Sequence, residues 1–234
     1  MKKNLTLVHT SDLHLGPDSF PDDALDGFES VMGLASTLKA DGLLVAGDLF
    51  DSGRSPLEIV QYAFQRFGEL PFPVFLLPGN HDVLLTNAGQ SLTGLPDLSP
   101  NTHILLQNRG ELVVLEGLGL SVWGSPVYNH EPSFHPLEGV CSRPFGGWYI
   151  VMAHGLVMDE HVGPLRSSPI TYDELKQVDC DYIALGHIHT FRDVTSEGAP
   201  AFYSGAPSGS QPATVALVTL DPIDGVSVER VLLS

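Results

Sequence analysis

The amino-acid sequence predicts an α/β fold in which buried parallel strands alternate with helices. Short apolar runs alternate with segments of helical spacing through the first half of the chain, and more short apolar runs fill the second half. The chain has 234 residues, of which 43% are hydrophobic, and this content excludes general disorder. A chain of this length buries about 70–75% of its unfolded surface and needs no disulfide staple. The length fits one large domain or two small ones, and we expect a single domain over residues 1–234.

The first half of the chain has the order strand, helix, strand, helix, strand. The apolar runs that predict its three strands are residues 5–9, 43–46 and 74–77. Apolar side chains at helical spacing predict the first helix over residues 22–39. These side chains are Leu25, Phe28, Met32, Ala35 and Leu38. The order favours parallel strands joined by right-handed crossovers.

The second helix has a start signal of its own. Ser55 is interpreted as the N-cap, Pro56 as the first helical residue and Glu58 as the partner in a capping box. We therefore expect a helix from this point to about Leu70.

The second half of the chain is richer in strands. The apolar runs that predict them are residues 104–107, 112–115, 120–123, 149–153, 182–185, 201–203, 214–220 and 226–233. A short helix is expected near residues 171–177. Residues 125–147 and 155–169 are expected to be long loops that contain Pro and Gly, and loops of that length are usually functional or mobile.

The charge balance excludes a simple basic nucleic-acid-binding module. The chain has 11 basic and 28 acidic residues, which gives a formal net charge of −17. Such modules bind the phosphate backbone through a surface of Lys and Arg. An enzyme that acts on phosphates is not excluded, because bound metals can supply local positive charge.

The N-terminus and the two cysteines predict a soluble, cytoplasmic protein without a membrane partner. The apolar stretch after Lys2 and Lys3 is too short for a signal peptide. No run approaches the roughly 20 apolar residues of a membrane-spanning helix. Cys141 and Cys180 are far apart and outside any C-x-x-C pair, so we expect buried neutral thiols rather than a zinc site. Few cysteines also suit a reducing compartment.

Each predicted buried strand is followed by side chains that can bind a metal. The five segments are Asp12-Leu13-His14, Gly47-Asp48, Gly79-Asn80-His81-Asp82, His154-Gly155 and Gly186-His187-Ile188-His189. Ligands of open α/β sheets bind outside the carboxyl ends of the strands, so we expect these side chains to meet in one cleft. The flanking glycines are expected where the backbone turns sharply or approaches a metal closely. They are Gly47, Gly79, Gly155 and Gly186.

The donor set has the chemistry of a two-metal site. It contains two carboxylates, one carboxamide and four imidazoles. They are Asp12, Asp48, Asn80, His14, His154, His187 and His189. Oxygen and nitrogen ligands without a thiolate suit Mn, Fe, Zn or Co better than Ca or Mg. We expect two divalent ions, with manganese as the first choice and Fe, Zn or Co as alternatives.

Single motifs of this set also have ordinary structural explanations. An Asp-x-His after a strand is more often a turn than a ligand pair, and Gly-Asn-His-Asp fits a type I turn. His187 and His189 could lie on opposite faces of an extended segment. The occurrence of all five segments together, each after a strand, favours the metal site.

Together the five segments resemble the calcineurin-like metallophosphoesterase family, over residues 5–205. Within the family, His9-Thr10-Ser11-Asp12 and Gly47-Asp48-Leu49-Phe50-Asp51 are most similar to the nuclease subunits of DNA double-strand-break repair complexes. Tyr203-Ser204-Gly205 is similar to a segment that these subunits carry after the last motif. The resemblance implies two mixed β-sheets packed as a sandwich and flanked by helices.

The resemblance also implies a role for each site residue. Asp12, His14 and His189 would bind one metal, Asn80, His154 and His187 the other, and Asp48 would bridge the two. His81 would be the catalytic acid, and Asp51 would orient it. The implied reaction is hydrolysis of a P–O bond by a hydroxide held between the metals, with a proton donated by His81 to the leaving oxygen.

The resemblance leaves the substrate open. Protein phosphatases of the family carry Arg directly after the second Asp of their GDxxD motif, where this chain has Ser52, with Arg54 two places on. The repair nucleases carry a further DNA-binding domain, which we do not expect in this chain. We expect a phosphodiesterase or an exonuclease-like DNA repair nuclease that acts on a nucleotide or short nucleic acid, or on longer DNA with a basic or ATPase partner subunit. The alternatives are a phosphatase or phosphodiesterase of a small metabolite and a non-catalytic metal-binding scaffold that docks partners.

Other polar and aromatic residues of the chain are given ordinary roles. The residues expected to be solvated loop positions near the cleft are Tyr128, Arg143, His161, Arg166 and Arg192. The histidines expected on the surface are His103, His130 and His135. The aromatic residues expected in the core or as loop anchors are Trp123, Phe145 and Trp148.

Overall fold

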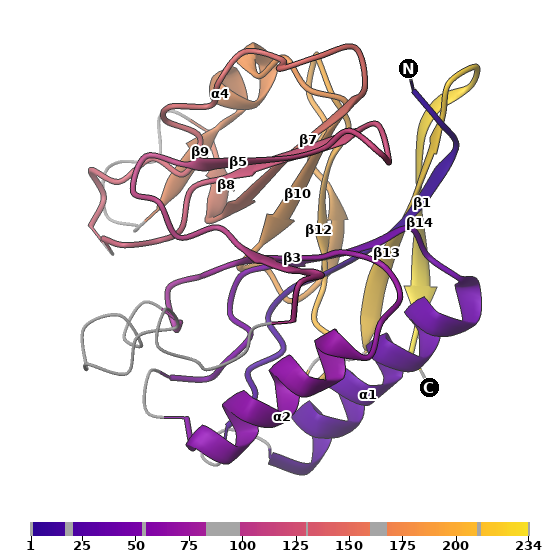
Figure 1. The fold of residues 1–234 in the computed structure, drawn as a ribbon. Helices are drawn as coiled ribbons and strands as arrows, with labels where there is room; N and C mark the ends of the chain where they lie inside the picture. Colours follow the sequence, from indigo (N-terminus) through magenta and orange to yellow (C-terminus); the bar gives the residue numbers. More distant parts are fainter. Residues whose placement is uncertain are drawn as a thin grey trace.

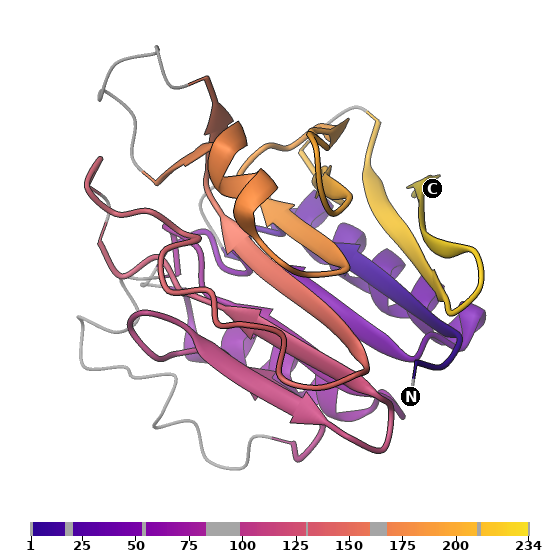
Figure 2. The ribbon, with the colours of Figure 1, turned by 90° about the horizontal axis from the view of Figure 1, so that it is seen from above.

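A computed structural model describes residues 2–16, 21–52, 55–82, 99–129, 131–159, 168–209 and 212–233. Within these residues two six-stranded mixed sheets pack face to face, which confirms the predicted α/β sandwich. Figures 1 and 2 show the layers, with α1 and α2 on the outer side of one sheet and α4 on the outer side of the other.

The first sheet has the strand order β14-β13-β1-β2-β3-β4. Its parallel strands are β1 (Leu5–Thr10), β2 (Gly42–Ala46), β3 (Val74–Leu77) and β4 (Thr102–Ile104). An antiparallel hairpin of β13 (Thr214–Asp221) and β14 (Gly225–Leu232) extends the sheet beside β1. The helices that cover its outer face are α1 (Pro21–Leu38) and α2 (Leu57–Gly68).

The second sheet has the strand order β11-β12-β10-β7-β6-β5. Its parallel strands are β6 (Leu120–Gly124), β7 (Trp148–His154), β10 (Tyr182–Gly186) and β12 (Ala201–Ser204). The antiparallel edge strands are β5 (Glu111–Leu115) and β11 (Phe191–Asp193). Outside this sheet lie α4 (Tyr172–Gln177) and a parallel pair of β8 (Leu156–Met158) and β9 (Pro169–Thr171).

The central strands are buried on both faces, and this explains their uninterrupted apolar sequences. In β2, Leu43 and Val45 pack in the core between the first sheet and its helices. Leu44 and Ala46 pack in the core between the two sheets. Because side chains alternate between the faces of a strand, a run that is apolar at every position serves both cores.

The predicted start of the second helix is wrong by one residue. The N-cap of α2 is Pro56, with φ −54° and ψ 139°, and no side chain caps it. The Ser55 hydroxyl instead contacts the carbonyl oxygens of Leu15 at 3.1 Å and Ser52 at 2.9 Å. Ser55 therefore secures the loop before the helix. A true capping box occurs in α4, between Thr171 and Glu174.

The strand predicted over residues 104–107 is displaced toward the N-terminus. The amide of Leu105 still donates to the Leu76 carbonyl at 2.9 Å. The amides of Leu106 and Gln107 donate instead to the Glu111 carboxylate, at 2.8 and 3.3 Å. These two bonds turn the chain away from the sheet and end the pairing with β3.

The other predicted elements agree with the structure to within about two residues, and β8, β9 and β11 are additions. These three strands have three residues each, too few for a periodic pattern. Two of them lie at least partly in the segment 155–169, which is therefore not wholly a loop. The segment 125–147 has no helix or strand in its described part.

Several predictions about single residues need correction. Cys141 and Cys180 are free, as expected, but only partly buried. Burial raises the pKa of the Cys180 thiol to about 12, which keeps it neutral. His103 is not on the surface but half-buried, and its ring stacks on that of Phe75 with the ring centroids 5.3 Å apart. His135 is also half-buried, 2.8 Å from a Glu174 oxygen.

Other predicted positions agree with the structure or lie outside its described residues. Trp123 and Trp148 are buried in the core, as predicted, and Phe145 is half-buried. The predicted positions outside the described residues are Arg54, His130, His161 and Arg166. In the described ranges, no helix is both long enough and apolar enough to cross a membrane.

Candidate metal centre

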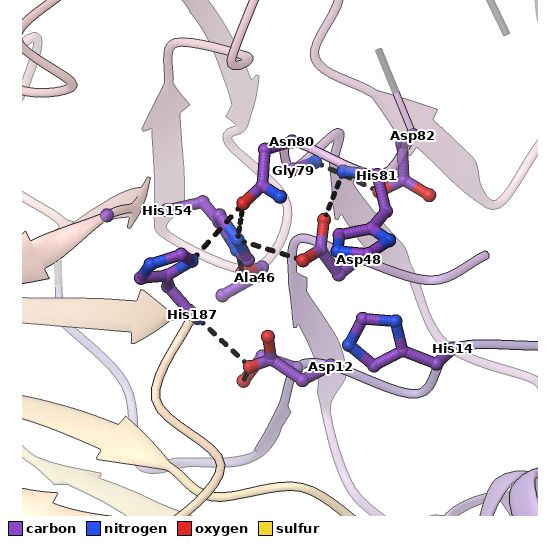
Figure 3. A network of polar contacts seen from close by, with 12 residues as sticks. Asp12, His14, Ala46, Asp48, Gly79, Asn80, His81, Asp82, His154 and His187 are labelled. Carbon is purple, nitrogen blue, oxygen red and sulfur yellow. Dashed lines mark hydrogen bonds and ion pairs between the residues drawn. The ribbon is translucent and has the colours of Figure 1, made fainter. Parts of the chain in front are cut away.

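The five predicted segments meet at one edge of the sandwich. In the first sheet, β1, β2 and β3 lead into Asp12-Leu13-His14, Gly47-Asp48 and Gly79-Asn80-His81. In the second sheet, β7 ends in His154 and β10 leads into His187 and His189. These strands are parallel within each sheet, so their carboxyl ends lie together. Figure 3 shows the side chains from both sheets facing one another.

One group of donor atoms surrounds the space between Asp48, Asn80 and His154. His154 Nε2 lies 3.2 Å from Asp48 Oδ2 and 3.0 Å from Asn80 Oδ1. His187 Nδ1 lies 3.2 Å from the same Asn80 oxygen. His154 Nδ1 lies 2.9 Å from the Ala46 carbonyl, which can only accept, so this nitrogen donates. In the neutral ring, Nε2 then presents its lone pair toward the two oxygens.

This group attracts positive charge. Burial works against a charged His154, but the carboxylates of Asp48 and Asp12 outweigh it and raise the His154 pKa to about 9. A proton on His154 Nε2 would let this nitrogen donate to the oxygens of Asn80 and Asp48 that face it. A divalent cation in the same place would satisfy all of these donors at once, so the residues fit a metal.

A second group surrounds Asp12. Asp12 Oδ1 lies 3.5 Å from His189 Nε2, and the ligand atoms of Asp12, His14 and His189 all lie within 4.8 Å of one another. In the part of the chain that the structure describes, Asp12 Oδ1 and both ring nitrogens of His14 are buried without a hydrogen-bond partner. An unsatisfied buried polar group costs about 1–3 kcal/mol, and a bound cation would remove that cost.

The backbone at these residues is strained. Asp12, His14, Asp48 and His187 all have positive φ angles, of 54°, 51°, 52° and 99°. Such conformations cost of order 1–3 kcal/mol for residues other than Gly and gather at functional sites. Asp and His are among the residues that tolerate them best.

Glycine allows the two sheets to approach at this edge. Gly47 has a φ of +96°, and a Cβ there would lie 2.1 Å from His154 Nδ1. A Cβ on Gly186 would lie 1.8 Å from the Ala46 carbonyl oxygen. Any larger residue at either position would push apart the strands that carry the ligands. The sharp turn predicted for the flanking glycines occurs at Gly47, and the close approach that the structure shows at these two glycines is between the two sheets.

Asp51 contacts the imidazoles of both His81 and His14. His81 Nδ1 lies 2.6 Å from the backbone carbonyl of Asp51, to which it donates. The Asp51 carboxylate is 4.0 Å from His81 Nδ1 and 3.5 Å from His14 Nδ1. The contact between Asp51 and His81 is thus made mainly through the main chain of Asp51. The bond leaves Nε2 of the His81 ring, whose side chain is 42% exposed, as its available nitrogen.

Asp82 is a buried site residue for which the sequence alone predicted no role. Its carboxylate accepts the amides of Gly79 at 2.9 Å, Phe50 at 2.9 Å and Leu49 at 3.2 Å. Burial and the nearby Asp48 raise the Asp82 pKa to about 6. Asp82 ties together the loops after β2 and β3. The sequence signal that could have indicated a role for Asp82 is its place in the Gly-Asn-His-Asp segment.

A cleft of about 300 Å³ opens over these side chains. Its lining residues are His14, Ala24, Asp48, Asp51, Asn80, His81, His187, His189, Ser208 and Gly209. Ala24, Ser208 and Gly209 were not predicted, because nothing in their sequence marks them. Among the described residues, no Lys or Arg lines the cleft. A larger cavity, of about 700 Å³, lies beside α4 and contains none of the predicted site residues.

Three other candidates do not line this cleft. Tyr128 packs on Phe134 with ring centroids 4.9 Å apart. Arg143 forms ion pairs with Asp181 at 2.6 Å and Asp179 at 3.2 Å. Arg192 lies exposed on β11. Tyr128 is exposed in a loop, as predicted. The predictions for the two arginines need correction, because Arg143 is partly buried in its ion pairs and Arg192 lies on a strand rather than in a loop.

Comparisons with solved structures support the fold. TT1561 of Thermus thermophilus has a TM-score of 0.65 at 13% identity, over 97% of this chain and 99% of that one. A dimetal phosphatase from Danio rerio has a TM-score of 0.58 at 11% identity, over 98% of each chain. At these identities the likeness concerns the fold alone.

Comparisons with sequences identify the family. A Bacillus subtilis metallophosphoesterase, YhaO, is 28% identical over 88% of this chain and 53% of its own length. A DNA double-strand break repair protein, Mre11 of Aeropyrum pernix, is 34% identical over 85% of this chain and 52% of its own. The SbcD component of the Bacillus subtilis nuclease SbcCD is 23% identical over 98% of this chain and 70% of its own. The chain thus spans about half the length of YhaO and Mre11. The sequence model of the calcineurin-like phosphoesterase family, whose members use divalent metals, matches residues 5–191. The chain therefore belongs to the calcineurin-like phosphoesterase family.

Proposed function

We propose that this chain is a dinuclear-metal-dependent phosphoesterase of the phosphodiesterase or nuclease type. The observation that carries the proposal is the meeting of two groups of candidate metal-binding side chains at one edge of the sandwich, in and directly beneath one cleft. One group contains Asp12, His14 and His189, and the other contains Asp48, His154 and His187 with Asn80 beside them. We assign the first group to one ion and the second group to the other, with Asp48 shared, and we propose manganese for both.

The ions, when bound, would supply an activated water and positive charge for the phosphoryl oxygens. The protein's own residues prepare the site for them. Asp12 and Asp48 place two buried negative charges opposite imidazoles that come from the other sheet. The strained loops after the strands keep these donors close together before any ligand arrives.

We assign His81 as the acid that protonates the leaving oxygen. Its amide donates to Asp48 Oδ1 at 2.8 Å, which places the residue beside the shared ligand. Its Nδ1 is occupied by the Asp51 carbonyl, so Nε2 would meet the substrate from the open side of the cleft. Asp51 is assigned as the residue that orients His81. General acids of this kind contribute about 10²–10⁴-fold to rate.

For the substrate we propose a phosphodiester in a nucleotide or a short nucleic acid strand. The relatives named as nuclease and repair proteins favour nucleic acid. The net charge of −17 and a cleft whose described lining has no Lys or Arg disfavour unaided wrapping of a long duplex. For longer DNA we propose a basic or ATPase partner subunit. We also propose that residues 1–234 act as one domain.

The test measures turnover of three substrates by the purified chain with Mn²⁺. We expect hydrolysis of a generic aryl phosphodiester and of single-stranded DNA, with weaker activity on an aryl phosphomonoester. Activity on the monoester alone would redirect the proposal to a phosphatase. If the chain binds Mn²⁺ but hydrolyses none of the substrates with Mn, Fe, Zn or Co, the non-catalytic scaffold would remain as the function.

His81→Asn tests the assignment of the acid. We expect turnover to fall by about 10²–10⁴-fold while two Mn²⁺ ions still bind. His135→Asn is the matched control, because His135 is a half-buried histidine that pairs with Glu174 outside the cleft. An unchanged rate in His81→Asn, or an equal loss in His135→Asn, would remove His81 from this role.

A further inference from the structure

The hydrogen bonds behind Asp12 connect this residue to the second sheet. Ser11 Oγ lies 2.5 Å from Asp12 Oδ2, and Ser204 Oγ, at the end of β12, lies 3.0 Å from Ser11 Oγ. All three residues are buried, with exposed fractions of 0%, 1% and 0% for Ser11, Asp12 and Ser204. Water therefore does not compete for these bonds, and a short bond to a carboxylate is among the strong ones.

The direction of these bonds follows from the available protons. A carboxylate only accepts, so the Ser11 hydroxyl donates to Asp12. The proton of the second bond must then come from Ser204, which donates to the Ser11 oxygen. The Gly205 carbonyl, 2.9 Å from Ser204 Oγ, competes for the same proton. Thr214 holds Ser204 from the other side, through a 2.9 Å bond from its hydroxyl to the Ser204 carbonyl.

The hydrogen bonds use one carboxylate oxygen of Asp12, and the other oxygen faces His189. Asp12 Oδ2 accepts both the Ser11 hydroxyl and the amide of His187, the latter at 3.0 Å. Asp12 Oδ1 keeps no hydrogen-bond partner in the described chain and lies 3.5 Å from His189 Nε2. Two donors on one oxygen fix the rotation of the carboxylate. Outer partners of this kind orient metal ligands in many proteins.

We propose that Ser204 positions Asp12 for metal binding, and that it acts through Ser11. The second sheet would then set the orientation of a ligand that belongs to the first sheet. Neither serine touches the substrate or the metal in this role. The inference rests on the proposed function, in which Asp12 is a metal ligand.

The test is a Mn²⁺ titration of the full chain, followed by the electron paramagnetic resonance signal of free Mn²⁺. We expect Ser11→Ala to weaken one of the two binding steps by about 10–100-fold, and Ser204→Ala to weaken the same step by about tenfold. The double variant should bind no more weakly than Ser11→Ala alone, because Ser204 acts only through Ser11. Ser204→Thr retains a hydroxyl and should restore the affinity.

Ser121→Ala is the matched control. The Ser121 hydroxyl is buried in the second sheet, away from the ligands, and donates to the Trp148 carbonyl at 3.1 Å. If the role of Ser204 is purely structural, Ser204→Ala and Ser121→Ala should both lower the melting temperature and leave the Mn²⁺ affinity unchanged. That result would overturn the proposal. So would additive losses in the double variant. If the wild-type chain binds no Mn²⁺, the proposed function itself fails. This outcome is distinct from one in which the wild type binds Mn²⁺ and the serine variants bind it equally well.

Discussion

Individual residues of the candidate metal centre serve two requirements at once. Asp12 and Asp48 provide carboxylates and also adopt left-handed backbone conformations, with φ of 54° and 52°. A residue with a bulkier or β-branched side chain would pay more for such a conformation. The neighbouring Gly47, with φ of +96°, absorbs a turn that no other residue tolerates as well. The strain at these positions is thus matched to residue types that also suit the chemistry.

Gly47→Ala should damage the metal centre directly. The new Cβ would lie 2.1 Å from His154 Nδ1, so the imidazole must shift from its position beside Asn80 and Asp48. We expect a loss of about 1–3 kcal/mol in the free energy of unfolding, from the strained backbone. We also expect weaker Mn²⁺ binding at the step that involves His154. Urea unfolding and Mn²⁺ titration measure the two effects.

Gly33→Ala is the control for that experiment. Gly33 lies exposed in α1, and a Cβ there meets nothing within 4 Å. Alanine favours a helix, so this variant should gain roughly 0.5–1 kcal/mol in stability and bind Mn²⁺ normally. Equal Mn²⁺ affinity in both variants would show that His154 tolerates the displacement and would contradict the argument from Gly47.

At the scale of elements, the sequence predicts the strands better than it predicts their ends. Runs such as 43–46 and 74–77 are recognisable because both faces of these strands are buried. The start of α2 was misplaced because Ser55, a typical N-cap residue, uses its hydroxyl on the loop carbonyls of Leu15 and Ser52. Such a competing partner lies far away in the sequence or in an irregular loop, where no local pattern reports it.

The same distinction applies to the candidate site. The meeting of Asp12, Asp48 and His154 could be predicted, because parallel strands bring their carboxyl ends to one edge. The contacts of Asp51 could not, since they depend on which side of a loop faces His14 and His81. The family resemblance indicated the residues of the site, whereas the distances between them required the fold.

Asp181 joins three separate segments of the chain through its charge. Its carboxylate lies 2.7 Å from Lys2 Nζ and 2.6 Å from Arg143 Nη1, and it accepts the Tyr149 amide at 2.8 Å. Burial opposes the charged form, but Arg143 and Lys2 outweigh it and hold the pKa of Asp181 below its usual value. Asp181→Asn should therefore cost about 1–3 kcal/mol at pH 7, measured by urea unfolding.

The pH dependence of that loss has a definite sign. Because the folded pKa of Asp181 is lowered, its charge stabilises the fold above the unfolded pKa of about 3.9. This contribution disappears as the pH falls through the lower, folded pKa. The difference between wild type and Asp181→Asn should shrink over the same range. Asp179→Asn, whose side chain is 75% exposed, should change stability by less than about 0.5 kcal/mol at any pH. A pH-independent difference would contradict this account.

At the scale of the whole molecule, the acidic surface and the candidate metal centre would have opposite effects on a phosphate substrate. The net charge of −17 repels polyanions at long range. Two divalent ions would place positive charge in the cleft alone. A short phosphodiester could reach that cleft without covering the rest of the surface, whereas a duplex could not. Under the proposed function, the charge of the chain would therefore limit the length of the bound strand more than it limits the chemistry.

The metal centre also lies where the two sheets meet, so metal binding should stabilise the whole fold. Asp48 and Asp12 come from the first sheet, and His154, His187 and His189 come from the second. Mn²⁺ at about 100 times its Kd should add about 2.7 kcal/mol to the free energy of unfolding for each ion bound. For a chain of this size that corresponds to a rise of about 5–10 °C in Tm, measured by calorimetry and reversed by a chelator.

Asp48→Asn distinguishes Mn²⁺ bound at the candidate site from Mn²⁺ bound by the acidic surface. The substitution retains an oxygen for the His81 amide but removes the charge that the two proposed ions would share. The readout is the Mn²⁺-induced shift in Tm and not the starting Tm, because the variant also loses the contact between Asp48 and His154. We expect most of the shift to disappear in Asp48→Asn. Asp179→Asn makes the same change of charge at an exposed position and should keep the full shift. If Mn²⁺ stabilised both variants equally, the ions would be bound by the acidic surface rather than by the strand ends.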